Sequence, residues 1–325
     1  MISPAPASLS LTPDAAFELT PDAAFDAYAA AVRNEVTVEQ NIAHVAAVLS
    51  SATFRSLSTQ QPLEAMTRLA RIAPSAGAAG ARTMADVFDA AYATLRRDYR
   101  NEYVFKNTIV SNIVFGRHRP TTASAILELP VGFSFADVAV FNGTSTVYEI
   151  KTDLDSFARL DSQIRDYSSR IEFVHVVVSD ARAIAAERYV PDHVGVLALR
   201  RNGALTEVRP AQSNRPRLRS EHIFGLLRRA EAERVVGAAA ANADGGPAER
   251  WEALRSAFAA LDSADAHRGA VNALRLRGMQ ATRVAAHAEL PQSARALAYS
   301  ATLSKAAGER LLRRLQQPIP PVWGV

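Results

Sequence analysis

The sequence predicts a mixed α/β fold in which helical regions flank one central sheet. Residues 133–151, FSFADVAVFNGTSTVYEIK, contain two β-rich runs around an Asn-Gly pair, which is typical of a β-hairpin. The apolar run at residues 173–179, FVHVVVS, is typical of a buried parallel strand that a helix connects to the hairpin. Helical periodicity dominates both ends of the chain. We therefore expect a mixed sheet with helices before and after it.

The core is expected to follow the order helix, three strands, helix, strand (αβββαβ) within residues 83–210. An N-terminal helical region (1–82) and a C-terminal helical region (211–325) flank it, and the Gly/Ala/Ser run at 75–81 marks the first boundary. Helices are predicted at about 11–33, 37–49, 63–72, 83–116 with a kink near 98, 155–167, 220–236 and from 251 onward; strands are predicted at 123–131, 133–141, 145–151, 173–179, 194–199 and 205–208.

Composition limits the classes of protein to which the chain can belong. The 325 residues are 48% hydrophobic and 22% charged, which is ordinary for a globular protein and enough for a core. Without cysteine, disulfides and thiolate metal sites are excluded. Because there is no run of 18 apolar residues and no signal-peptide pattern, we expect no membrane partner and a cytoplasmic location. Walker, dinucleotide-binding, zinc and nucleophile-elbow patterns are missing, so those enzyme classes lack residues to support them.

Three charged residues interrupt the apolar strands of the hairpin: Asp137, Glu149 and Lys151. Ionised groups on a half-buried sheet cost free energy unless they are paired or have a function. Glu149 and Lys151 share a face of the sheet because they are two residues apart. If residues 142–144 form a three-residue loop with Gly143 in the left-handed conformation, Asp137 lies opposite Glu149 on the same face.

The same register pairs Phe141 with Ser145. On the reverse face it places Ala136, Val138 and Val140 beside Thr146, Tyr148 and Ile150, which together would form an apolar core surface. A two-residue loop would instead move Asp137 to the other side. One register therefore accounts for both the apolar face and the charged face.

Two carboxylates beside a lysine suit metal-assisted chemistry. Mg²⁺ and Mn²⁺ prefer oxygen ligands, so Asp137, Glu149 and the Ile150 carbonyl are candidate ligands. The ammonium of Lys151 could orient a water molecule or stabilise charge that develops on a phosphate. The chain contains only three lysines, Lys106, Lys151 and Lys305. Because lysine is so rare here, its presence beside the two acids favours a specific role.

These residues resemble the PD-(D/E)XK nuclease-like superfamily. Its pattern is an acidic residue on one strand followed by D/E-X-K on the next, and Asp137 with Glu149-Ile150-Lys151 matches it. Members commonly add a glutamate on the preceding helix and a glutamine on the following helix, for which Glu102 and Gln163 are the matching positions. The proline of the family's name is replaced by Ala136.

The resemblance covers roughly residues 85–210. It implies a restriction-endonuclease-like core, a Mg²⁺ or Mn²⁺ cofactor, and catalytic roles for Asp137, Glu149, Lys151, Glu102 and Gln163. The family also implies a nucleic-acid partner, with DNA favoured over RNA. Candidate nucleic-acid contacts are Arg117 and Arg119 in a basic loop, Tyr167 one turn after Gln163, and Arg215 and Arg217 in the arginine-rich segment 200–219.

Several residues have an alternative interpretation. Glu102 could instead be an exposed helix residue paired with Lys106 at i+4, and Tyr167 could be a core residue. For Glu128 an ordinary edge-strand position is the preferred interpretation, with a site role as the alternative. For His175 a satisfied core histidine is preferred over a ligand.

The sequence therefore predicts a metal-dependent nuclease that hydrolyses phosphodiester bonds. The first alternative is a nucleic-acid-binding protein whose nuclease-like site is idle, because a fold does not by itself imply an activity. The second alternative is an interaction or assembly module, with a homo-oligomer formed through the C-terminal helices.

Overall fold

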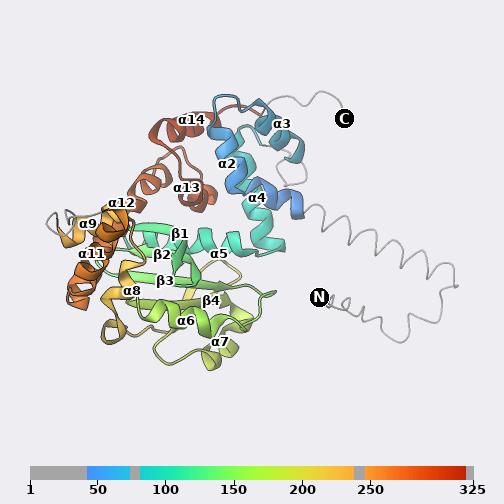
Figure 1. Cartoon of the computed structure of the whole chain (residues 1–325). Coiled ribbons are helices and arrows are strands. Elements are labelled where there is room, and N and C mark those ends of the chain that lie inside the picture. Colours follow the sequence, from blue (N-terminus) through green and yellow to red (C-terminus); the bar gives the residue numbers. More distant parts are fainter. Residues whose placement is uncertain (1–41, 74–80, 238–245, 320–325) are drawn as a thin grey trace, which may run out of the picture.

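The computed structural model describes residues 42–73, 81–237 and 246–319, and they form a six-stranded mixed sheet with helices on both faces (Figure 1). The strands are β1 (Ser124–Val131), β2 (Ser134–Phe141), β3 (Ser145–Lys151), β4 (Phe173–Ser179), β5 (Gly195–Leu199) and β6 (Leu205–Arg209). Their spatial order follows the chain. β1, β2 and β3 are antiparallel, β4 and β5 continue parallel to β3, and β6 is antiparallel to β5. The predicted mixed α/β class is confirmed.

The helices occupy both ends of the chain and two crossovers of the sheet. They are α2 (Ser51–Ser58), α3 (Leu63–Ile72), α4 (Met84–Asp98), α5 (Glu102–Ile109), α6 (Leu160–Ser168), α7 (Ala183–Tyr189), α8 (Ser220–Phe224), α9 (Arg229–Val236), α11 (Pro247–Ala259), α12 (Ser263–Ala285), α13 (Arg295–Ala301) and α14 (Lys305–Leu315). A π-helical segment, η1 (Val110–Arg117), continues α5, and residues 42–48 are also helical. The predicted helix at 11–33, the linker at 75–81 except its last residue, and the start of the helix at 37–49 lie outside the described residues.

The central hairpin has the predicted register. Phe141 pairs with Ser145 across a three-residue loop, and Gly143 has φ +70°, the left-handed conformation that glycine adopts without a Cβ penalty. Regular β2–β3 pairing ends at Val138 and Tyr148. Asp137 is therefore the first residue of β2 beyond the ladder.

The reverse face of the hairpin differs from the prediction at one residue. Val138 and Val140 pack with Tyr148 as expected, but Ala136 packs on the opposite side of the sheet, with Ala139. Residues two apart share a face only while a strand stays regular. On the neighbouring strand β1, Glu128 has φ +53°, and the pairing of β1 with β2 skips Glu128 and Asp137. Both strands change face at this point.

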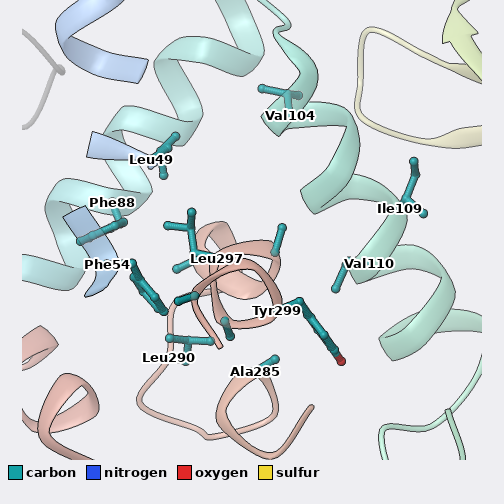
Figure 2. Close-up of a cluster of buried hydrophobic side chains, with 14 of the residues drawn as sticks. Leu49, Phe54, Phe88, Val104, Ile109, Val110, Ala285, Leu290, Leu297 and Tyr299 are labelled. Atoms are coloured by element: carbon teal, nitrogen blue, oxygen red, sulfur yellow. The ribbon is translucent and has the colours of Figure 1, made fainter. Parts of the chain in front are cut away.

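Two hydrophobic clusters cover the two faces of the sheet. The α5-side cluster combines sheet residues with α2 to α5, η1, α13 and α14, so both ends of the chain contribute to it (Figure 2). Leu49 and Phe54 from the N-terminal region lie there with Leu297 and Tyr299 from the C-terminal region. The α6-side cluster combines the other sheet face with α6 to α9, α11 and most of α12. The three predicted regions thus share their cores.

The N- and C-terminal helices are also joined by polar contacts. Arg310 donates from Nε to the Ser58 carbonyl at 3.0 Å, and Arg314 donates to the carbonyls of Leu57 and Thr59. These carbonyls are at the end of α2, where backbone acceptors lack partners within the helix. Cations at a helix C-terminus are also favoured by the helix dipole.

Several helices agree with the predicted ranges. Thr83 and Asp86 form a capping box at the start of α4, and this helix ends at Asp98, where a kink was expected. The helices α2 and α7 were not predicted, and two predicted helices were wrong in extent. The helix after the hairpin begins at Leu160, because Asp155 accepts from the Thr152 amide and hydroxyl and closes a turn instead of capping a helix.

The second error concerns the predicted helix at 220–236, which is two helices, α8 and α9, separated after Phe224.

No helix among the described residues is both long enough and apolar enough to cross a bilayer.

The shared core predicts cooperative unfolding of both ends with the sheet. Leu297→Ala removes a side chain that is 2% exposed, so we expect a loss of about 2 to 5 kcal/mol in the free energy of unfolding. Chemical denaturation monitored by circular dichroism should show one transition at a lower midpoint. Leu276→Ala, at a position 53% exposed, serves as control and should change little. Separate transitions for the sheet and the terminal helices would contradict a shared core.

Candidate functional site

Asp137 lies where β2 separates from β3. Its Oδ2 accepts a hydrogen bond from the Ile150 amide at 2.6 Å, so the side chain replaces the backbone partner that a continued ladder would supply. This contact fixes the carboxylate beside the last three residues of β3. Asp137 and the Glu149-Ile150-Lys151 motif are therefore adjacent, as the register predicted.

Glu149 and Lys151 form a buried polar network with helix α6. Lys151 Nζ donates to Glu149 Oε1 at 2.8 Å and to Gln163 Oε1 at 3.0 Å. The Tyr167 hydroxyl lies 2.7 Å from Glu149 Oε2 and 2.8 Å from the Phe135 carbonyl. Gln163 and Tyr167 are one helical turn apart on α6, so a single helix face holds both motif residues.

The burial of this network is nearly complete. Glu149 is 2% exposed, Lys151 is 7% exposed and Tyr167 is 0% exposed. A buried carboxylate and ammonium stabilise each other only with further hydrogen bonds to their remaining donors and acceptors, which Gln163 and Tyr167 supply. Because Tyr167 is fully buried, we revise its predicted role: it supports Glu149 and does not face a nucleic acid.

A second acidic cluster lies next to Asp137. One carboxylate oxygen each of Glu102, Glu128 and Asp137 come within 4.8 Å of one another. Lys106 forms ion pairs with both Glu102 and Glu128. Glu102 thus makes the alternative i+4 pair with Lys106 and also belongs to the cluster. Glu128 lies on the edge strand β1 with a half-exposed side chain, as preferred, and it also belongs to the cluster.

Burial and charge make Asp137 an unusual acid. Burial, and next the nearby charge of Glu149, raise its pKa to about 8, while the hydrogen bond from the Ile150 amide opposes the shift. Burial and Glu149 likewise raise the pKa of Tyr167, so its hydroxyl keeps its proton. A carboxyl that is protonated at neutral pH must lose its proton before it can bind a metal ion.

A groove of about 680 Å³ opens beside the acidic cluster. Its walls come from α5, the edge strand β1, the end of α12, and α13 with the residues that follow it. Glu102, Lys106 and Glu128 lie along one wall, and Arg228 and Arg277 line it as well. Glu102 and Glu128 are therefore accessible through this groove, whereas Glu149 and Lys151 are buried and do not line it.

Two strained backbone positions border the same groove. Glu128 has φ +53° and Thr302 has φ +48°, and they are the non-glycine residues with positive φ in the described part of the chain. Such conformations cost about 1 to 3 kcal/mol each and gather at functional sites. Their coincidence in one groove supports a functional interpretation of it.

The predicted nucleic-acid-binding arginines lie at the opposite end of the hairpin. His118, between Arg117 and Arg119, contacts Asn142 in the hairpin loop at 2.7 Å. Arg215 lines a small cavity with Gly143 and forms an ion pair with Glu172 at 2.9 Å.

Arg217 lines a separate pocket with His193 and α6. The strand from Ser145 to Lys151 spans roughly 20 Å at about 3.3 Å per residue. The structure therefore does not bring Arg117, Arg119 and Arg215 to the acidic cluster.

His175 is a buried residue of the sheet, as preferred. It is 7% exposed, stacks on Tyr148 with ring centroids 5.3 Å apart, and burial lowers its pKa to about 4. Its Nδ1 has no hydrogen-bond partner in the described residues, so the histidine is buried but only partly satisfied.

Sequence reasoning did not list Lys106 as a site residue, and it gave Glu128 a site role only as the alternative. Two sequence features could have indicated Lys106: lysine is rare in this chain, and Lys106 lies one helical turn from Glu102. Glu128 gave less warning, because no local pattern indicates a left-handed residue in the middle of a strand.

Comparison with known proteins places the whole sheet within one family. A family model described as "Bacteriophage P4 protein cII" matches residues 95–284, which is more than half of the chain. This chain belongs to the bacteriophage P4 protein cII family. The match to the P4 cII family begins near the end of α4 and ends in α12, so it includes every residue of the acidic cluster and of the buried network.

A curated member of the P4 cII family provides a more local comparison. Protein cII of Enterobacteria phage P4 is 32% identical to this chain over 103 residues, which is 31% of this chain and 39% of that protein. The aligned part thus spans about two fifths of the relative's length. The search of solved structures gave no match.

The raised pKa of Asp137 predicts a pH-dependent stability of this P4 cII family member. The folded pKa, about 8, exceeds the unfolded value near 3.8, so the folded protein keeps a proton that the unfolded chain has lost. In a chelating buffer, stability should fall as pH rises from about 4 to about 8 and then level off. Asp137→Asn removes this dependence and keeps an oxygen for the Ile150 amide.

Urea denaturation at several pH values measures the effect. At about pH 9 we expect Asp137→Asn to be more stable than the parent, by an amount on the order of a few kcal/mol. Asp192→Asn, whose side chain is fully exposed, should retain the parent's pH profile. Parallel profiles for the parent and Asp137→Asn would show that Asp137 is not the titrating group.

Proposed function

We propose that this protein is a metal-dependent nuclease that hydrolyses phosphodiester bonds, in DNA in preference to RNA. The observation that supports the proposal is the union of Asp137, Glu149, Lys151 and Gln163 at the point where β2 leaves β3. The αβββαβ order of the core, with the mixed sheet, is consistent with a restriction-endonuclease-like fold.

The residues present fit a hard divalent cation. Carboxylate oxygens are the ligands that Mg²⁺ and Mn²⁺ prefer, and Glu102, Glu128 and Asp137 offer three of them within 4.8 Å. Asp137 and Glu149 with the Ile150 carbonyl were the predicted ligands. We add Glu102 and Glu128 as more accessible candidate ligands, since Glu149 already accepts from Lys151 and lies beside the Tyr167 hydroxyl. A bound divalent ion would supply an activated water molecule and neutralise charge on a phosphate.

The protein's own residues divide into accessible and supporting groups. Glu102 and Glu128 line the groove, where a phosphodiester could reach them, and Asp137 lies within 4.8 Å of them. The ammonium of Lys151 is held by Glu149 and Gln163.

A second function, a nucleic-acid-binding protein with an idle site, has one observation in its favour. Glu149 and Lys151 pair with each other and are almost completely buried, so neither group is free for chemistry in this conformation. Metal binding without turnover, combined with salt-sensitive DNA binding, would support this alternative.

Cleavage assays decide between the two functions. Purified protein with Mg²⁺ or Mn²⁺ should cut at least one member of a panel of linear, nicked and structured DNA. Lys151→Ala and Glu149→Gln should each reduce the rate by about 100-fold or more, because each removes a charge near the reacting phosphate. Lys305→Ala changes an exposed lysine and should cut at the parental rate.

Folding of the variants must be verified, because Lys151→Ala leaves Glu149 buried without its partner. Circular dichroism and the thermal midpoint provide that check. Equal cleavage by a folded Lys151→Ala variant and the parent would remove Lys151 from the mechanism. A lack of cleavage of every substrate with either metal would favour the idle-site alternative.

A further inference from the structure

The ammonium of Lys106 lies in the position where a cation is expected. It contacts one carboxylate oxygen each of Glu102 and Glu128, which are two of the three acids in the cluster completed by Asp137. Lys106 is thus a cation already bound to the groups that would hold a divalent metal ion. This observation is independent of the spacing of the acids.

The contacts of Lys106 exceed those of an ordinary helix pair. Its side chain is only 13% exposed, while those of Glu102 and Glu128 are 55% and 54% exposed. Glu102 is one turn away on α5, but Glu128 comes from β1, 22 residues further along the chain. Glu128 is also held in a left-handed conformation, which a solvated surface pair would not require.

An ammonium and a divalent ion on the same two carboxylates repel each other. A divalent ion binds carboxylate oxygens at roughly 2.0 to 2.1 Å, which brings it close to the positive charge of Lys106. Binding of metal at this cluster therefore competes with the Lys106 ion pairs. By linkage, the two cations weaken each other's binding by the same factor.

We propose that Lys106 is a built-in competitor for the metal ion, and that metal binding releases its ammonium into the groove. The proposal rests on the proposed function, because it concerns the metal of that site. The groove gives the released group a place, since Lys106 itself lines it together with Arg228 and Arg277. Arg277 is already paired with Glu231, and no ion pair is found for Arg228 within the described part of the chain.

The released ammonium would make the groove more positive when metal is bound. An anionic group such as a phosphodiester would then meet Lys106 and Arg228 on the walls of one groove. Metal and phosphate would bind cooperatively, because the metal exposes a ligand for the phosphate. Without metal, Lys106 would remain neutralised by Glu102 and Glu128.

Lysine labelling tests the displacement directly, because the chain has only Lys106, Lys151 and Lys305. The full chain is treated briefly with an amine-acylating reagent, with and without Mn²⁺, and the modified lysines are quantified by peptide mass spectrometry. Mn²⁺ should raise the labelling rate of Lys106 several-fold. Lys305, which is exposed in both states, is the internal reference and should not change.

Calorimetric titration with Mn²⁺ gives the second measurement. Lys106→Met keeps the length of the side chain and removes the competing charge, so Mn²⁺ should bind at least about fivefold more tightly than to the parent. Lys305→Met is the matched control and should bind like the parent. Tighter binding with enhanced labelling of Lys106 in the parent supports displacement.

Two results would overturn the proposal. The first is Mn²⁺ binding that leaves the labelling of Lys106 unchanged or lowers it. The second is the failure of both the parent and Lys106→Met to bind Mn²⁺ at millimolar concentration. Neither readout requires cleavage, so displacement of Lys106 without any nuclease activity would preserve this inference and reject the proposed function.

Discussion

The hydrogen bond from the Ile150 amide to Asp137 Oδ2 is the contact on which the site depends. It forms where β2 and β3 stop pairing, and it occupies a backbone donor that would otherwise be unsatisfied in a buried place. The same contact fixes a carboxylate beside the motif Glu149-Ile150-Lys151. One hydrogen bond therefore satisfies the backbone where the strands separate and also brings the acids together.

Separation of the strands also divides the site into two levels. Below it, Glu149 and Lys151 are buried and held by α6 through Gln163 and Tyr167. Above it, Glu102 and Glu128 are half exposed along a groove. Asp137 is the residue that belongs to both levels, which explains why burial and a neighbouring carboxylate both raise its pKa.

The sequence predicted the sheet well because its signals are local. The Asn-Gly pair with Gly143 fixed the loop length, and from it followed the register and the meeting of Asp137 with β3. The error at Ala136 has a different origin. Period-two reasoning assumes a regular strand, and the break on the neighbouring strand falls at Glu128, where no glycine or asparagine announces a left-handed residue.

Contacts between distant segments were beyond sequence reasoning for a related reason. Lys106 and Glu128 come from a helix and an edge strand whose relative position depends on packing of the whole α5-side cluster. The same holds for the shared core of Leu49, Phe54 and Leu297, since periodicity shows which face of a helix is apolar but not which partner it meets. Arg117 and Arg119 lie away from the acidic cluster because the sequence neighbourhood they share with the hairpin is that of its loop, not of its open end.

Two requirements conflict at Glu128: its left-handed backbone favours glycine or asparagine, whereas a negative charge on the groove wall requires an acidic side chain. A glycine there would adopt φ +53° without steric cost, and an asparagine would accept it more readily than glutamate does. Either exchange would relieve the backbone and at the same time delete a charge from the groove wall. A lineage that keeps glutamate at this position therefore sacrifices some stability for that carboxylate, whereas drift toward a small or amide residue would signal that the acidic wall is no longer needed.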